Sequence, residues 1–158
     1  MAIPNSKEQP LTPLPHGALN HCFGCGLDNR AGLRLHFFTD SENNVVCQLR
    51  LAARFAGPPG HAHGGIIATL LDEAMSKTNR ARGIVAMTRH MSVEYLRPVP
   101  LGVALTLTAQ HTGAVGRRNH TEAQVADASG QVLATAKAVF VTVSPDVLKG
   151  RQVVERRS

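Results

Sequence analysis

Only one long stretch of the chain carries apolar residues at helical spacing, from about residue 64 to residue 82. Its apolar members lie on most sides of the predicted helix: Ile66, Ile67, Ala68, Leu70, Leu71, Ala74 and Met75. A helix that is apolar nearly all round is a buried helix. Residues 55–65 precede it and hold too many Gly and Pro residues for a regular element. The pattern predicts one central helix entered through an irregular loop.

The rest of the pattern is typical of β-strands. Runs at 32–38 and 44–51 flank a turn-rich segment and predict a hairpin, and four more strands are predicted at 84–96, 103–109, 121–125 and 131–143. The last strand places the small residues Ala134, Ala136 and Ala138 on one face, where a helix can approach closely. The order β-β-α-β-β-β-β predicts an α+β fold, a mostly antiparallel sheet wrapped around one long buried helix. One helix cannot cover both faces of such a sheet, so we expect self-association.

The 158 residues fit one domain. We expect an N-terminal extension at 1–20, the folded domain at 21–144 and a basic C-terminal tail at 145–158. No apolar run reaches the roughly 20 residues of a membrane helix, and the N-terminus lacks the apolar region of a signal peptide. These features predict a cytoplasmic protein without a membrane partner.

Charge and composition narrow the choice of ligand. The formal net charge is +6, but aromatic residues make up only 4% of the chain and there is no Trp. Nucleic-acid surfaces usually combine basic and aromatic side chains, so a nucleic-acid partner is not expected. The basic excess fits a small anionic ligand better than a polymer, although charges of the tail alone would also produce it.

Asp72 is the most conspicuous polar residue of the predicted helix. On a helical wheel it shares its sector with Gly65, Thr69, Ser76 and Asn79. Small neighbours leave room for a substrate beside a working carboxylate. The alternatives are a structural carboxylate that hydrogen-bonds to Ser76 or Thr69 and an exposed residue at an interface.

The helix begins at His63-Gly64-Gly65. Glycines there leave the first N–H groups open at the positive end of the helix dipole, where they can stabilise an oxyanion. A tight loop that needs no Cβ explains the same glycines. Eight residues separate Gly64 from Asp72, roughly 12 Å along the axis. One carbonyl cannot reach both groups of one chain, so joint action predicts a dimer.

These residues resemble a known signature. Phe55-x-Gly57-x-x-Gly60-x-x-His63-Gly64-Gly65, followed by Thr69-Leu70-x-Asp72-Glu73, is similar to the motif of hotdog-fold acyl-CoA thioesterases of the phenylacetic-acid-degradation (PaaI-like) group. The stretches 93–102 and 22–33 also resemble parts of that family. The resemblance implies the hotdog fold, hydrolysis of an acyl-CoA thioester to an acid and free CoA, and a homodimer that often pairs into tetramers.

The resemblance also implies roles for single residues. Gly64 would offer its N–H to the thioester oxygen, His63 would support that loop, and Asp72 of the other subunit would be the general base or the nucleophile. Thr88 aligns with a family hydroxyl that helps to place the water. The remaining expected substrate contacts are the small residues near Asp72 and the arginines that could meet CoA phosphates: Gly65, Thr69, Ser76, Arg89, Arg97, Arg117 and Arg118.

Two other functions stay open at this point. Gly57 occupies the position where some family members carry Asn or Gln, which helps to hold the thioester or water. The absence of this amide is consistent with a second function, a non-catalytic acyl-CoA-binding or regulatory module. His61 with Glu73 could serve a hotdog hydratase or dehydratase, although Glu73 is also well placed for an ion pair with Lys77. In related sets of the family the acid at the position after Asp72 is used, so Glu73 is a further candidate for the catalytic acid.

No cofactor or metal is expected. Cys22 and Cys25 form a lone C-x-x-C, whereas a zinc site needs about four ligands, so we interpret the pair as a reduced structural turn.

Overall fold

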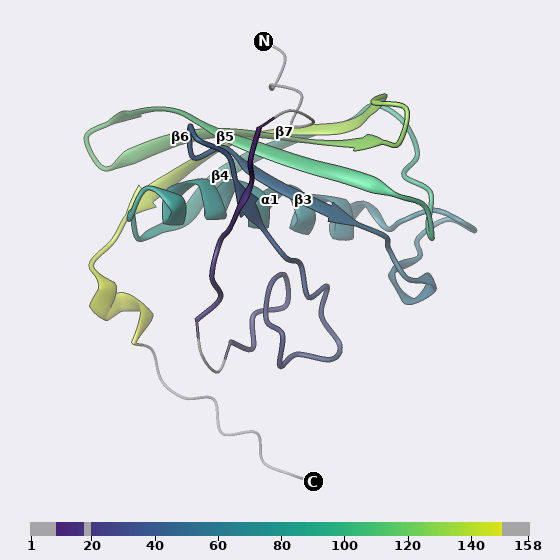
Figure 1. The fold of residues 1–158 in the computed structure, drawn as a ribbon, viewed down its shortest axis with the longest axis horizontal. Helices are drawn as coiled ribbons and strands as arrows, with labels where there is room; N and C mark the ends of the chain where they lie inside the picture. Colours follow the sequence, from purple (N-terminus) through teal and green to yellow (C-terminus); the bar gives the residue numbers. More distant parts are fainter. Residues whose placement is uncertain (1–8, 18–19, 150–158) are drawn as a thin grey trace, which may run out of the picture.

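A computed structural model describes residues 9–17 and 20–149 (Figure 1). Its main elements are one α-helix and one seven-stranded antiparallel sheet. The elements are β1 (Thr12–Pro13), β2 (Phe38–Thr39), β3 (Val45–Leu49), α1 (Gly64–Ala81), β4 (Ala86–Tyr95), β5 (Leu105–Val115), β6 (Arg118–Asp127) and β7 (Val132–Thr142), with short 3-10 helices at Ala53–Phe55 and Pro145–Leu148. This is the predicted α+β architecture with one long helix.

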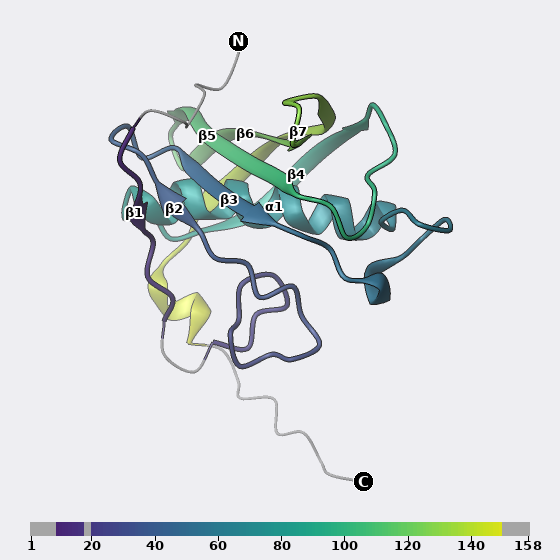
Figure 2. The ribbon, with the colours of Figure 1, turned by 45° about the vertical axis from the view of Figure 1, so that its right-hand side comes forward.

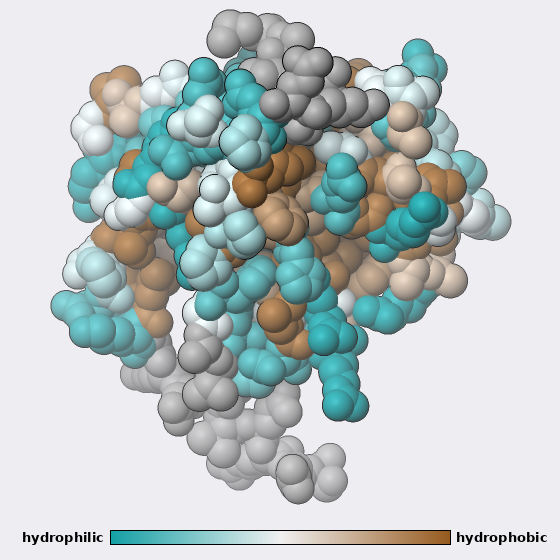
Figure 3. Space-filling view, in the orientation of Figure 1, coloured by the Kyte–Doolittle hydropathy of each residue, from teal (hydrophilic) through white to brown (hydrophobic). Residues whose placement is uncertain are grey.

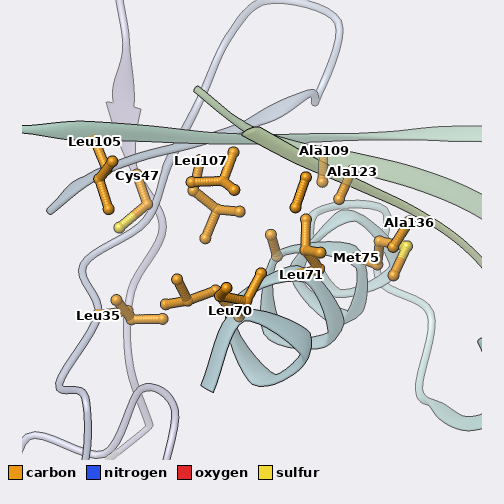
Figure 4. Packing of buried hydrophobic residues seen from close by; sticks show 14 of the residues in the cluster. Leu35, Cys47, Leu70, Leu71, Met75, Leu105, Leu107, Ala109, Ala123 and Ala136 are labelled. Atoms are coloured by element: carbon orange, nitrogen blue, oxygen red, sulfur yellow. The ribbon is translucent and has the colours of Figure 1, made fainter. Parts of the chain in front are cut away.

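The sheet has the strand order β1-β2-β3-β5-β6-β7-β4, and α1 packs against β3 to β7. Figures 1 and 2 show the helix lying along one side of the sheet. The predicted core faces are buried: Leu70, Leu71 and Met75 of α1 are fully enclosed. Figure 4 shows them directed toward Leu107, Ala109 and Ala136 of the sheet. The alanine face of β7 therefore lets the helix lie close to the sheet, as its small side chains predict.

The predicted strand at 32–38 is wrong for most of its length. Only Phe38 belongs to a strand, β2, which pairs with β3 in the expected antiparallel manner. The backbone N–H groups of Leu33 and Leu35 instead donate to the carbonyls of Phe23 and Gly24, at 2.7 and 2.9 Å. This segment keeps the alternation of a strand, with Leu35 and Phe37 buried. It is not a strand of the sheet because its backbone partner is an irregular turn.

The expected N-terminal extension also contributes to the sheet. Thr12–Pro13 forms the short strand β1, in register with Phe38–Thr39. Most of the expected C-terminal tail, and residues 1–8 of the extension, lie outside the described residues. No helix in the described part of the chain is both long and apolar enough to span a bilayer.

Strand β4 forms an edge of the sheet and is irregular at one point. Thr88 faces Phe140 and His90 faces Val139, so Arg89 is an extra residue that forms a β-bulge. Exposed apolar side chains lie on both sides of the bulge along the chain: Met87 before it, and Tyr95 and Leu96 at the end of the strand. Figure 3 shows apolar surface across the middle of one face of the molecule, interrupted by polar side chains.

Candidate active site

The start of α1 presents a backbone donor. His63 is the N-cap, and its Nδ1 accepts a hydrogen bond of 2.9 Å from the N–H of Gly65. The N–H of Gly64, at the first helical position, has no acceptor among the described residues. The two glycines therefore differ: the cap uses the N–H of Gly65, and that of Gly64 is free for a ligand. Of the two glycines, only Gly64 keeps a free N–H, and His63 caps the same turn.

Gly64 lies in a groove of about 440 Å³ at this end of the helix. Tyr95, Leu96 and Pro98 from the end of β4 and the segment after it form one wall, and Ile67 and Val99 contribute apolar surface. The hydroxyl of Tyr95 donates to the carbonyl oxygen of Gly64 at 2.9 Å. Tyr95 had no predicted role, because its contact joins residues 31 apart in the chain. The groove is therefore mostly apolar, with a free N–H in its lining.

Asp72 forms a second polar centre further along α1. Thr88 of β4 donates to its Oδ1 at 2.8 Å. Burial raises the pKa of the Asp72 carboxyl above its ordinary value, and the charge of Glu73 acts in the same direction, while the bond from Thr88 opposes them. The structural alternative, a bond to Ser76 or Thr69, is not what the structure has. A half-buried carboxylate of raised basicity is well suited to accept a proton from water.

The bulge at Arg89 sets the direction of Thr88. Thr88, Met91 and Val93 all oppose residues of the buried face of β7, although 88 and 91 differ by an odd number. In a regular strand such residues would point to opposite sides of the sheet. The extra residue shifts the alternation and keeps Thr88 on the helix side, where it reaches Asp72. No pattern in the sequence locates this bulge.

Some of the other residues predicted to contact a substrate near Asp72 already make contacts within the protein. The hydroxyl of Thr69 donates to the carbonyl of Gly65 in its own helix at 2.9 Å. Ser76 is half-buried, and Asn79, which lies in the same sector of the helical wheel as Asp72, is 2% exposed and belongs to the core. This sector of the helix is therefore partly accessible near Asp72 and buried toward the end of the helix.

The predicted arginines divide into two groups. Arg89, Arg117 and Arg118 line one hollow of about 390 Å³ between the bulge of β4 and the β5–β6 turn. Arg97 instead lines the groove that contains Gly64. All four are exposed. Three guanidinium groups around one hollow form a site of positive charge suited to phosphate groups.

Gly57 has a structural explanation. A Cβ at this position would lie 2.8 Å from the Cα of His63, closer than real Cβ contacts allow. The N–H of His63 also donates to the carbonyl of Phe55 at 3.0 Å, which holds this loop against the helix cap. An Asn or Gln side chain would therefore not fit at this position without moving the cap.

The expected ion pair between Glu73 and Lys77 is present at 3.0 Å. Glu73 also lies against Cys22 and Gly24 of the N-terminal turn. His61 is placed elsewhere: it lines the groove of Gly64, and its Nδ1 lies 2.9 Å from the carbonyl of Pro59. No contact joins the pair considered for hydratase chemistry, Glu73 and His61, in the described part of the chain.

Comparisons with known proteins bear on this arrangement. Residues 59–134 match the thioesterase superfamily. The acyl-coenzyme A thioesterase THEM4 of Rattus norvegicus is 30% identical over 111 residues, which are 70% of this chain and 48% of that protein. The chain thus spans about half the length of this curated relative.

Solved structures share the fold. One, described as a thioesterase superfamily protein, has a TM-score of 0.74 and 34% identity, covering 77% of this chain and 60% of that one. The PaaI protein of the E. coli phenylacetic acid degradation operon has a TM-score of 0.66 at 20% identity, covering 71% and 81% of the two chains. A Streptococcus mutans protein bound to acetyl-CoA has a TM-score of 0.67 at 21% identity, covering 79% and 98%. At these last two identities the likeness concerns the fold.

Proposed function

The chain carries a hotdog-fold domain of the thioesterase superfamily, and on that premise we propose that it hydrolyses an acyl-CoA thioester to a carboxylic acid and free CoA. The observation that carries the proposal is the half-buried Asp72 carboxylate, oriented by Thr88 at 2.8 Å. The name of the relative THEM4, an acyl-coenzyme A thioesterase, supports the choice of substrate class.

Asp72 would act on the water. Its carboxylate takes a proton as the water oxygen attacks the thioester carbonyl carbon. The Thr88 hydroxyl donates to Oδ1, and its own oxygen remains able to accept a hydrogen bond from that water. Direct attack by Asp72 on the carbonyl is the second route that the same position allows.

Gly64 would act on the carbonyl oxygen. Its N–H, together with the positive end of the α1 dipole, stabilises the negative charge that forms on that oxygen in the tetrahedral intermediate. Collapse of the intermediate breaks the C–S bond, and the CoA thiolate leaves and takes up a proton. Tyr95, bonded to the Gly64 carbonyl, holds this first turn in place.

The two halves of this mechanism require two chains. Gly64 and Asp72 are separated by eight residues of helix, roughly 12 Å. The proposal therefore includes a homodimer in which Asp72 of one protomer faces Gly64 of its partner. Pairing of dimers into tetramers stays a prediction. Arg89, Arg117 and Arg118 would bind CoA phosphates, with Arg97 beside the groove.

Thiol release from a panel of short, medium and aromatic acyl-CoAs tests the proposal. We expect turnover by the wild-type chain and a loss of at least about 100-fold in kcat for Asp72→Asn, since general-base catalysis contributes about that much. Glu122→Gln is the matched control, because the ion pair that this half-exposed carboxylate makes within the described residues is with Lys137 on another strand. Full activity of Asp72→Asn would refute its assignment as the base, and CoA binding without any turnover would favour the non-catalytic module.

A further inference from the structure

Two cysteines and a carboxylate meet beside α1, at the residue next to Asp72. The Sγ atoms of Cys22 and Cys25 and a carboxylate oxygen of Glu73 all lie within 4.8 Å of one another. The separation of Cys22 Sγ and Glu73 Oε2 is 3.6 Å. The ligands come from segments 51 residues apart, so only the fold unites them.

These distances suit a tetrahedral cation. Zinc binds sulfur at about 2.3 Å and carboxylate oxygen at about 2.1 Å, which places a sulfur and an oxygen ligand about 3.6 Å apart. Thiolate ligands favour zinc over magnesium or calcium. We propose that Cys22, Cys25 and Glu73 bind a zinc ion, with water in the remaining position on the exposed side of Cys22. The C-x-x-C lacked further ligands in the sequence, and the helix supplies the third.

Neighbouring groups already orient these ligands. The Nδ2 of Asn20 donates to Cys25 Sγ at 3.3 Å, and the ammonium of Lys77 lies 3.0 Å from both Cys25 Sγ and Glu73 Oε1. The two oxygens of Glu73 are thus divided: Oε1 faces Lys77 and Oε2 faces Cys22. Such outer hydrogen bonds fix the orientation of metal ligands and tune their basicity.

The charges balance in both states. Without the ion, the Glu73 carboxylate offsets the charge of Lys77. With it, two thiolates, one carboxylate, Zn²⁺ and the Lys77 ammonium again sum to zero. Because zinc binds thiolates, each thiol that coordinates it gives up its proton, so binding should release two protons and its affinity should fall as the pH is lowered.

The turn that carries the cysteines is shaped for close approach to the helix. A Cβ on Gly24 would lie 2.6 Å from Glu73 Oε2. The N–H of Gly26 donates to the carbonyl of Cys22 at 2.8 Å and closes the turn. Bound zinc would fasten this turn to α1 at the residue next to Asp72, independently of the thioesterase activity.

Metal titration of the whole chain tests the proposal. Protein reduced with a phosphine and stripped by a chelator is titrated with Zn²⁺ against a chromophoric competitor, and proton release is measured in weak buffer. We expect one zinc per chain, two protons per zinc, and a thiolate-to-metal charge-transfer band with Co²⁺. Cys22→Ser should weaken zinc binding at least about tenfold, because even the loss of an outer hydrogen bond to a ligand costs that much. Cys22 is exposed, so the variant is expected to fold.

Cys47→Ala is the matched control, since it removes a cysteine that lies outside the cluster, in strand β3. It should keep the affinity, the proton release and the cobalt band. Equal zinc affinity in wild type and Cys22→Ser would overturn the proposal, and so would a cobalt complex without a charge-transfer band. Thermal unfolding with and without Zn²⁺ gives a further check: wild type should gain stability and Cys22→Ser should not.

Discussion

At Asp72 three physical effects act on one carboxyl group, and one of them opposes the other two. Burial and the nearby charge of Glu73 raise its pKa, and the hydrogen bond from Thr88 lowers it. If the ionised carboxylate is the base, activity is lost as the pH falls through this pKa. The acid limb of the pH–rate profile should therefore lie above the ordinary value of 3.8.

Replacement of Thr88 by Val removes the hydroxyl at nearly constant volume. We expect kcat/KM to fall about tenfold, the kinetic equivalent of the roughly 1.5 kcal/mol that a hydrogen bond to a charged group contributes. The acid limb should move to higher pH, because the bond that lowers the pKa is gone. Thr88→Ser should restore both quantities. Profiles of kcat/KM against pH test this, and an acid limb that shifts downward would contradict it.

Gly64→Pro isolates a single backbone donor. Proline is tolerated at the first helical position, and the extended backbone of His63 (φ −64°, ψ 137°) suits a residue that precedes proline. A Cβ at Gly64 meets Tyr95 only at an ordinary 3.7 Å. The helix should therefore form as before, measured by circular dichroism, while kcat falls about 100-fold through loss of the N–H. A variant that keeps the wild-type kcat would remove Gly64 from the mechanism.

Among the elements, the loop before α1 is fixed by backbone contacts. Gly57→Ala places a Cβ against the Cα of His63, so we expect unfolding free energy to drop by about 1–3 kcal/mol, as for other overpacked sites. Gly17→Ala is the control, because nothing lies within 4 Å of its added Cβ. Urea denaturation compares the two. Equal stability would mean that the loop can move away from the cap without cost.

The sequence predicted those elements whose pattern is local. The helix α1 and the faces of β6 and β7 follow from periodicity, and their burial confirms them. The stretch 32–38 did not, because alternation shows which side chains are buried and not which backbone they pair with. The bulge at Arg89 and the bond from Tyr95 to Gly64 were missed for the same reason: each depends on a partner distant in the chain. The α+β fold, by contrast, was predicted from the order of the elements, and the resemblance to thioesterases from a local motif that lies mostly within the matching residues 59–134.

For the whole molecule, the central prediction is a site shared by two chains. Asp72→Asn and Gly64→Pro should each be nearly inactive alone. When the two variants are unfolded and refolded together, about half of the dimers are mixed, and each mixed dimer has one site with both groups intact. Activity should then recover to roughly a quarter of the wild-type value.

Each variant refolded alone is the control for that experiment, with the oligomeric state measured by light scattering. If both groups of one site came from one chain, mixing would restore nothing. Arg117 and Arg118 share a hollow with Arg89 of the same chain. Because Arg89 follows Thr88, which is bonded to Asp72, we expect these arginines to serve the site that contains Asp72 of their own chain. The cytoplasmic location stays a prediction, as does the tetramer.

Strand β4 ends the sheet, and among residues 9–17 and 20–149 nothing pairs with the outer side of its backbone. A ten-residue edge that carries Met87 and Tyr95, each about half exposed, is a template on which other strands can add. A partner protomer that covered this edge would therefore protect the chain from fibrous aggregation as well as complete the catalytic site. Substitutions that weaken that contact would reduce the yield of native protein before they produced a stable monomer, and natural selection on the interface would act through solubility as much as through catalysis.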